Sequence, residues 1–331
     1  TGEIDCRIEC GGTLRNRQGV SFPEIDLVRS AFGPDVEQDL DFAVENGVEY
    51  IAASFVQSPE DVQKIRTYLK ERGAEIPIIA KIENRRAVDA LTAIVEIADG
   101  AMVARGDLGV ELPVEEVPEL QKRIIRTTVS NGKPVITATQ MLDSMERNPR
   151  PTRAEASDVA NAIFDGTSAV MLSGETAAGI YPVEAVTTMD AIARRAEQAI
   201  DEFGTLQNIQ PNPSNQVTEA VAQAAHTMST HLSAPAIVAV TETGFTARMI
   251  SKYRPRCPIV AVTASEKVMR TLAMNWGVIA IHAEGSDEAR VEIALDRARE
   301  MGLVSPGDIV VATGGISQSA GATNMIRVVT C

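Results

Sequence analysis

Long apolar runs, basic clusters and paired cysteines are all missing from this chain of 331 residues. No apolar stretch reaches the roughly 18 residues that a membrane-spanning helix needs, so we predict no membrane association. No Lys/Arg-rich run occurs and the formal net charge is −14, which disfavours a nucleic-acid partner. The 4 cysteines are too few and too scattered for a disulfide framework, and no second pair joins Cys6 and Cys10 to make a zinc site. We therefore expect free thiols.

Two common phosphate-binding motifs are also absent: no Gly-x-x-x-x-Gly-Lys-Ser/Thr loop occurs, and no Gly-x-Gly-x-x-Gly follows a strand. No secretory signal is visible, and we expect a cytoplasmic protein. The chain opens on Thr1 rather than Met, so we expect the natural start to lie upstream. The histidines His226, His231 and His282 have no partner at ligand or nucleophile spacing, and we assign them packing or surface positions.

What the chain does contain is a series of apolar strand-like runs that each end in a polar cluster, at residues 50–55, 78–84, 101–108, 134–140 and 169–176. The intervening stretches predict amphipathic helices over 37–45, 59–72, 117–131, 153–164 and 182–202. This alternation is typical of a parallel α/β sheet or barrel. In such sheets the ligands bind at the carboxyl ends of the strands, where the polar clusters lie.

A second α/β unit follows a Pro/Asn/Gln-rich linker at 204–216. Its predicted strands are 236–240, 259–263, 278–282, 309–312 and 325–329, and its predicted helices are 217–232, 247–253, 266–275 and 286–301. Residues 1–20 are predicted to form short β segments around a turn at Gly11 and Gly12, without a core of their own.

Lys81, Glu83 and Asp107 are the strongest candidates for chemistry. Lys81 and Glu83 lie two apart on one strand, so their side chains point to the same side, and Asp107 follows the next strand. Two carboxylates from neighbouring strands suit Mg²⁺, and a lysine beside them can neutralise phosphate charge or polarise a carbonyl. A structural Lys81–Glu83 ion pair is the alternative explanation for the first two residues.

Other candidates at the same strand ends have plain structural alternatives. Gly106 allows a close backbone approach and leaves N–H groups for an anion, although a simple turn also explains it. Ser54, Thr139 and Ser173 supply hydroxyls that can equally cap the next helix. Residues 147–155 are predicted to form a rigid basic loop for a substrate or subunit contact, followed by a capping box between Thr152 and Glu155.

In the second unit, residues 241–246 join a strand to a helix, and such a turn can bind an anion. The candidate effector-binding residues there are Thr241, Thr243, Gly244 and Thr246. The glycine-rich segment 314–321 is predicted to be a flexible loop that closes over this turn. Glu242 places negative charge at the mouth, so we expect a monophosphorylated sugar or nucleotide, or no effector, rather than a bisphosphate.

These segments together resemble the pyruvate kinase family. The motifs that carry the resemblance are AKIEN at 80–84, MVARGDLG at 102–109, ATQML at 138–142, PRPTRAE at 149–155, DVAN at 158–161, MLSGET at 171–176 and TNMIRV at 323–328. They cover nearly the whole chain from Gly12 onward. The resemblance implies a partial (β/α)8 TIM-type barrel followed by a separate α/β C-terminal domain.

The resemblance also implies a reaction, in which a phosphoryl group moves from phosphoenolpyruvate to ADP to give pyruvate and ATP in glycolysis. Glu83 and Asp107 would bind Mg²⁺ or Mn²⁺, and Lys81 would balance the charge of the phosphoryl group. The backbone at Gly106 and Asp107 would hold the substrate carboxylate, with Ser54 and Thr139 also at the substrate, while Thr139 and Ser173 would line the protonation side. K⁺, an allosteric phosphosugar or nucleotide effector and a homotetramer are further implications.

The chain departs from the family pattern at its start. Three earlier strands, with an Asn-x-Ser-His-Gly segment, an Asp-Thr-Lys-Gly-Pro-Glu segment and the K⁺ ligands, are not found. We therefore divide the chain into the tail of an inserted lid domain (1–20), part of the catalytic barrel (21–203), a linker (204–216) and a regulatory domain (217–331). An open barrel leaves unpaired edges, so we expect the chain alone to be inactive and prone to associate.

Two other functions stay open at this point. One is a Mg²⁺-dependent lyase or aldolase on a phosphoenolpyruvate-type barrel, which also places carboxylates around a pyruvate enolate. The other is a non-catalytic regulatory or assembly chain that keeps the fold.

Overall fold

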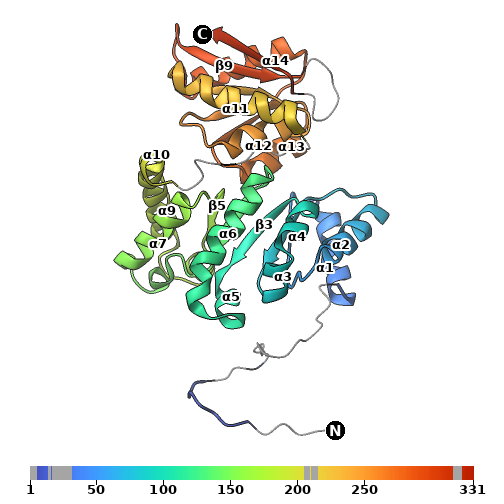
Figure 1. The fold of residues 1–331 in the computed structure, drawn as a ribbon, viewed down its shortest axis with the longest axis vertical. Helices are drawn as coiled ribbons and strands as arrows, with labels where there is room; N and C mark the ends of the chain where they lie inside the picture. Colours follow the sequence, from blue (N-terminus) through green and yellow to red (C-terminus); the bar gives the residue numbers. More distant parts are fainter. Residues whose placement is uncertain (1–5, 14–15, 17–31, 205–208, 210–214, 316–322) are drawn as a thin grey trace.

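The computed structural model describes residues 6–13, 16, 32–204, 209, 215–315 and 323–331. They form two α/β units, each built on a five-stranded sheet (Figure 1). We call the sheet of the first unit sheet A and that of the second unit sheet B.

Sheet A is wholly parallel and has its strands in chain order. They are β1 (Ile51–Ala53), β2 (Ile78–Ile82), β3 (Gly100–Ala104), β4 (Val135–Ala138) and β5 (Ala169–Met171). Each strand coincides with a predicted apolar run. Parallel strands that lie in chain order are the arrangement of a (β/α) barrel, so sheet A is a section of such a barrel.

Helix α1 precedes β1, and further helices follow each strand of sheet A. They are α1 (Pro34–Asn46), α2 (Pro59–Glu71), α3 (Arg85–Asp89), α4 (Leu91–Ile97), α5 (Arg105–Glu111), α6 (Val117–Ser130), α7 (Arg153–Phe164), α8 (Gly174–Ala177), α9 (Pro182–Glu197) and α10 (Ile200–Phe203). Local sequence sets their ends: Pro59 opens α2 inside a capping box of Ser58 and Asp61, and Gly47 ends α1 in the left-handed region at φ 60°.

The two faces of sheet A are packed unequally. The face covered by α1–α6 forms the largest apolar cluster, which includes Ile65, Ile78, Val103 and Ile124. The opposite face carries a much smaller cluster around Ile79, Met102 and Ile136. Sheet A is thus covered mainly on one side.

Sheet B has the order β10-β9-β6-β7-β8. Its strands are β6 (Ile237–Val240), β7 (Ile259–Thr263), β8 (Val278–His282), β9 (Ile309–Gly314) and β10 (Met325–Thr330), and its helices are α11 (Gln216–His231), α12 (Phe245–Lys252), α13 (Glu266–Thr271) and α14 (Asp287–Glu300). Strand β10 is antiparallel to β9, and the connection 315–324 is shorter than the dozen or more residues that a parallel crossover needs. Apolar clusters fill both faces of this sheet.

The structure confirms the predicted fold class and changes several details. Residues 6–13 form no strand, because no partner strand lies beside them in the described chain. The predicted helix 182–202 is two helices, α9 and α10, with a break at Gln198 and Ala199. The short helices α3, α4, α5 and α8 were not predicted. No helix among the described residues is long and apolar enough to cross a membrane.

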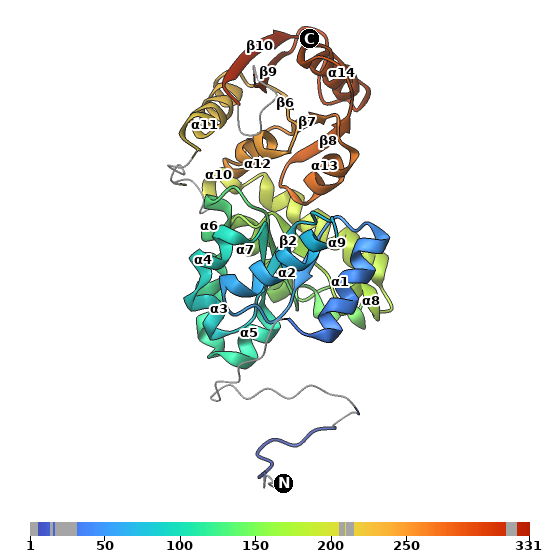
Figure 2. The same cartoon turned by 90° about the vertical axis from the view of Figure 1, so that its right-hand side faces the viewer.

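The C-terminal unit lies against the amino ends of the sheet A strands (Figures 1 and 2). Helix α6 runs up to α12, and α9 and α10 lie near the same boundary. Tyr50 Oη donates to the Thr271 carbonyl over 2.7 Å, and Arg270 Nε lies 3.0 Å from Glu49 Oε1. The carboxyl ends of the sheet A strands therefore face away from the C-terminal unit.

Candidate active site

Lys81 and Glu83 meet at the carboxyl end of β2, as their spacing predicts. Lys81 Nζ lies 2.5 Å from Glu83 Oε1 and donates to Ser54 Oγ over 2.8 Å. The second oxygen of Glu83 accepts the Phe55 N–H over 2.7 Å. Glu83 is only 4% exposed, so this ion pair and the backbone bond together offset the desolvation of its charge. Phe55, at φ 57°, holds the turn after β1 in the left-handed region.

Asp107 lies in the first turn of α5, directly after β3, and is exposed. Strands β2 and β3 are adjacent and in parallel register, with Ile82 opposite Val103. The carboxylates of Glu83 and Asp107 therefore arise from neighbouring strand ends.

Gly106 contacts Thr139 through its backbone. The Gly106 N–H donates to Thr139 Oγ1 over 2.8 Å. In this structure the threonine hydroxyl occupies the N–H that we expect an anion to use. A ligand carboxylate would take the place of that hydroxyl.

Thr139 has a strained backbone at the end of β4. Its φ is 71° and that of the next residue, Gln140, is 52°, a region that costs a β-branched residue about 1–2 kcal/mol. Arg105 holds it there: its guanidinium donates to the Thr139 carbonyl over 2.6 Å and to the Ala138 carbonyl over 3.2 Å. Asp158 of α7 fixes the guanidinium through two contacts of 2.7 Å.

Glu175 connects the ends of β4 and β5. It is 2% exposed, and its two oxygens accept the Leu142 N–H over 3.0 Å and the Ser173 N–H over 2.7 Å. Ser173 is thereby held beside the loop that follows Thr139. The motif around Ser173 contained Glu175, but only the fold reveals that its carboxylate is buried.

The capping alternatives for the three hydroxyls are not supported. Ser173 stands at the N-cap of α8 but makes no cap hydrogen bond, and Ser54 accepts from Lys81 instead. No helix begins directly after Thr139, and its hydroxyl accepts the Gly106 N–H. The predicted capping box of Thr152 and Glu155 is present at the start of α7.

These strand ends offer oxygen donors for a divalent cation. Each ionised carboxylate has about four lone-pair positions, so the two contacts of Glu83 leave room for a metal bond. A hard cation such as Mg²⁺ uses one or two protein carboxylates and takes its other ligands from substrate and water. The described part of the chain holds no cluster of three or more His, Cys, Asp or Glu side chains, and its cysteines are free, as expected.

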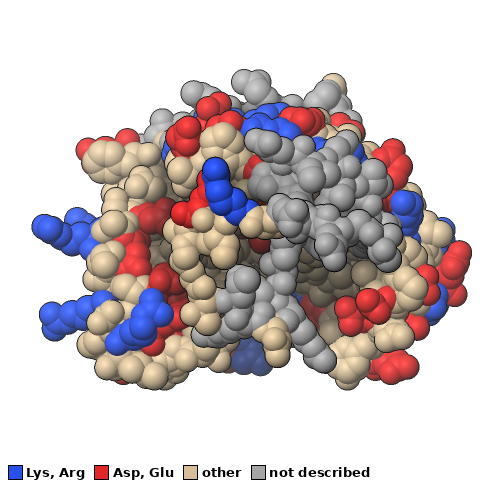
Figure 3. Space-filling view, turned by 90° about the horizontal axis from the view of Figure 1, so that it is seen from below, with Lys and Arg blue, Asp and Glu red and all other residues tan. Residues whose placement is uncertain are grey.

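Acidic and basic side chains are interspersed over this end of the molecule, which Figure 3 views from below. Within the basic loop, Arg147 pairs with Asp143 and Glu146 over 3.4 and 3.2 Å. Part of the positive charge predicted for this loop is thus balanced locally.

The candidate effector turn is internally satisfied. Thr241 and Thr246 are buried, and Thr246 Oγ1 lies 2.5 Å from Thr323 Oγ1. Glu242 Oε1 pairs with Arg290 of α14 over 2.6 Å, and Asp287 accepts from the same guanidinium over 3.1 Å. Most of the predicted loop 314–321 lies outside the described residues.

Comparison with known proteins agrees with the division of the chain into two α/β units. Residues 1–186 match the family model for the pyruvate kinase barrel domain, and residues 219–329 match that for the pyruvate kinase alpha/beta domain. The chain belongs to the pyruvate kinase family. Both matched segments correspond to the two α/β units described above.

Curated relatives are similar to nearly all of this chain. It is 51% identical to a pyruvate kinase of Bacillus licheniformis over 329 residues, which is 98% of this chain and 56% of the relative. A pyruvate kinase of Clostridium acetobutylicum is 48% identical over 98% of the chain and 70% of the relative. One of Geobacillus stearothermophilus is 50% identical over 99% of the chain and 56% of the relative. The chain thus spans little more than half the length of two of these relatives.

Proposed function

We propose that the protein transfers the phosphoryl group of phosphoenolpyruvate to ADP. The bond between phosphorus and the enol oxygen breaks, a bond from phosphorus to a terminal ADP oxygen forms, and the enolate gains a proton at carbon to give pyruvate. The observation that carries the proposal is the Lys81–Glu83 pair beside Asp107 at adjacent strand ends. Phosphoryl transfer needs positioned charge more than covalent catalysis, and these residues supply it.

Glu83 and Asp107 are the residues that would hold Mg²⁺ or Mn²⁺. When bound, the ion supplies positive charge to the oxygens of the substrate. Lys81 contributes a second positive charge, and Ser54 keeps its ammonium in position. The substrate carboxylate would be held by the backbone at Gly106 and Asp107 in exchange for the Thr139 hydroxyl.

Thr139 and Ser173 would serve the protonation of the enolate. Their backbones lie on neighbouring strand ends and are fixed by Arg105 and Glu175. A hydroxyl of ordinary acidity is a weak acid, so we assign these groups the task of orienting a proton source at the enolate carbon.

Several features remain proposals that the family membership supports. We propose K⁺ as a further cofactor, a homotetramer and a cytoplasmic location. We also propose the division into lid tail 1–20, barrel portion 21–203, linker 204–216 and regulatory domain 217–331.

For regulation, we propose that Thr241, Thr243, Gly244 and Thr246 bind a monophosphorylated sugar or nucleotide. Glu242 and Asp287 bring two carboxylates to the one guanidinium of Arg290. The net negative charge of this cluster disfavours a bisphosphate.

A coupled assay tests the reaction. The protein that carries this chain should form pyruvate from phosphoenolpyruvate only when ADP and Mg²⁺ are present. Cleavage of a 2-oxo acid without ADP would instead identify a lyase or aldolase. No turnover of either substrate by a folded protein would favour the non-catalytic alternative.

A further inference from the structure

Arg254 crosses the boundary between the two units. It follows α12, is 9% exposed, and has φ 51°. One terminal nitrogen donates to the Gly166 carbonyl over 2.6 Å and to Ser168 Oγ over 3.3 Å, both in the first unit. The other donates to the Ser251 carbonyl over 3.1 Å. Its buried Nε–H has no hydrogen-bond partner in the described chain, so the terminal nitrogens decide how the guanidinium lies.

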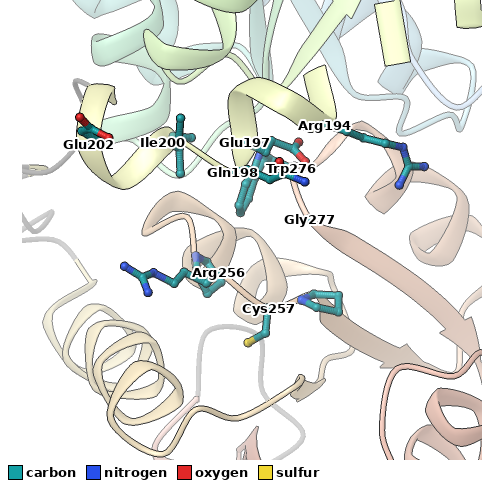
Figure 4. A pocket seen from close by; sticks show the side chains of 12 residues that line it. Arg194, Glu197, Gln198, Ile200, Glu202, Arg256, Cys257, Trp276 and Gly277 are labelled. Carbon is teal, nitrogen blue, oxygen red and sulfur yellow. The ribbon is translucent and has the colours of Figure 1, made fainter. Parts of the chain in front are cut away.

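The surroundings keep this guanidinium in place and charged. Its carbon lies 5.2 Å from the centre of the Trp276 ring, and Ser251 Oγ donates to the Trp276 carbonyl over 2.6 Å. Burial lowers the pKa of Arg254 to about 9, while the charge of Glu197 raises it, so the group is protonated at neutral pH. Trp276 and Glu197 also line a cavity of ≈ 730 Å³ between the units, opposite Arg256 and Cys257 (Figure 4).

Ser168 passes the contact of Arg254 on to β4. Its Oγ accepts the Val135 N–H over 3.2 Å, and its own N–H donates to the Val135 carbonyl over 2.9 Å. Thr167, 1% exposed, donates from its hydroxyl to the Val135 carbonyl over 3.1 Å and accepts from Thr137 Oγ1 over 3.0 Å. One arginine of the C-terminal unit thus contacts residues just before β5, and Ser168 among them bonds to Val135, the first residue of β4.

The far ends of these two strands carry Thr139 and Ser173. Strand β4 is 4 residues long, which at about 3.3 Å per residue separates the Arg254 contact from Thr139 by roughly 13 Å. A buried strand with bonds on both sides transmits a displacement along its length, since packed interiors are stiff. The strained backbone of Thr139 depends on such support.

We propose that Arg254 is a positioning residue for the candidate active site, acting through Ser168 and β4 on Thr139. The part of this inference that concerns catalysis rests on the proposed function. Its structural part, the coupling between Arg254 and the backbone around Thr139, stands by itself. The C-terminal unit thereby acquires a direct influence on the strand ends that face away from it.

Amide hydrogen exchange on the 331-residue chain tests the coupling without any need for activity. The reporter is the Gly106 N–H, which bonds to Thr139 Oγ1 at the far end of β4. Arg254→Met should speed its exchange about 10-fold, since its protection reflects local opening. Arg254→Lys, which keeps one charged donor, should restore part of the protection. The Ile51 N–H, bonded to Pro77 at the start of β1, should not change.

Arg256→Met is the matched control, because Arg256 lies two residues further on and is exposed. It should leave Gly106 exchange as in the wild type. If Arg254→Met perturbs the fold as a whole, Ser168→Ala removes the same bridge from the barrel side and should give the same local change. Unchanged Gly106 exchange in both variants, with effects confined to residues 166–168, would overturn the proposal.

Kinetics then separate this inference from the proposed function. In the active protein Arg254→Met should lower kcat about 10-fold and leave the KM for ADP unaltered. If the wild type forms no pyruvate, the proposed function fails while the exchange result still decides the coupling. An altered KM with unchanged kcat would contradict a role in positioning Thr139.

Discussion

Sheets A and B are built alike but use their polar strand ends differently. At the carboxyl ends of sheet A, Lys81, Glu83 and Asp107 combine one cation with two carboxylates, and Asp107 is exposed. At the turn after β6 in sheet B, the carboxylate of Glu242 is paired with a buried arginine, and Thr241 and Thr246 are buried. The first arrangement leaves charge available to a ligand, whereas the second is largely satisfied from within.

The apolar cores of the two units also differ, in how they are distributed over the two faces of each sheet. Sheet B has an apolar cluster on each face, and sheet A has its main cluster on one face only. Supporting polar contacts therefore matter more in the first unit. The difference teaches that a (β/α) framework provides the place for a site, while buried ion pairs decide whether its charges face a ligand.

The largest expected effect is on the reaction. Lys81→Met should lower kcat at least about 100-fold in the phosphoenolpyruvate assay, because it removes a positioned cation from the site of charge transfer. The double variant with Asp107→Asn should lose much less than the product of the single losses, since the groups act together. Lys70→Met, at an exposed lysine, is the control. Strictly multiplicative losses would argue against a shared site.

The next effect is on the stability of the first unit. Arg105→Met should lower its free energy of unfolding by about 2 kcal/mol, less than for a fully buried pair because Asp158 is partly exposed. Calorimetry should show this loss in the transition of the first unit alone. Arg147→Met removes an exposed pair and should change stability by less than about 0.5 kcal/mol. Equal losses of unfolding free energy in Arg105→Met and Arg147→Met would contradict a larger contribution from the Arg105–Asp158 pair.

The contact between the units should depend on pH. Burial raises the pKa of Tyr50 to about 12, above the ordinary value of 10.0, and the unfolded chain therefore ionises first. Folded-state stability should be complete well below pH 10.0 and fall by about 2 kcal/mol as the pH rises to about 12. Tyr50→Phe should flatten this dependence in denaturant titrations. An unchanged slope in the variant would assign the effect to other groups.

The smallest effect concerns the turn in the second unit. Glu242→Gln should cost less than about 1 kcal/mol, because Glu242 is partly exposed and Asp287 still pairs with Arg290. In calorimetric titrations the wild type should not bind fructose 1,6-bisphosphate, and the variant should bind inorganic phosphate more tightly than the wild type does. Glu288→Gln, at an exposed residue of α14, is the control. Tight bisphosphate binding with Glu242 intact would contradict the comparison of the two turns.

Sequence patterns predicted the strands and most helices because burial imposes a regular apolar spacing. They also predicted that Lys81 and Glu83 meet, since the two residues are near neighbours on one strand. They did not predict α5, whose two glycines, Gly106 and Gly109, are poor helix formers. The left-handed backbone conformation of Thr139 was not predicted either, because a β-branched residue gives no local sequence signal for a positive φ.

Long-range polar contacts were also beyond prediction from sequence. Arg105 and Asp158 lie 53 residues apart, and Arg254 and Gly166 lie 88 apart. Nothing local to any of these residues specifies its partner. The first pairing follows from the order of strands in sheet A, and the second follows from the packing of the two units against each other.

Direct binding of Mn²⁺ is the most decisive test of the account, because it reports on the strand ends of sheet A without requiring turnover. Electron paramagnetic resonance titration should find one Mn²⁺ site in the wild type, and Asp107→Asn should weaken it at least about 10-fold, as should Glu83→Gln. Lys81→Met should retain binding, since the lysine supplies no ligand. Affinity that is unchanged by the loss of either carboxylate would contradict the assignment of this site.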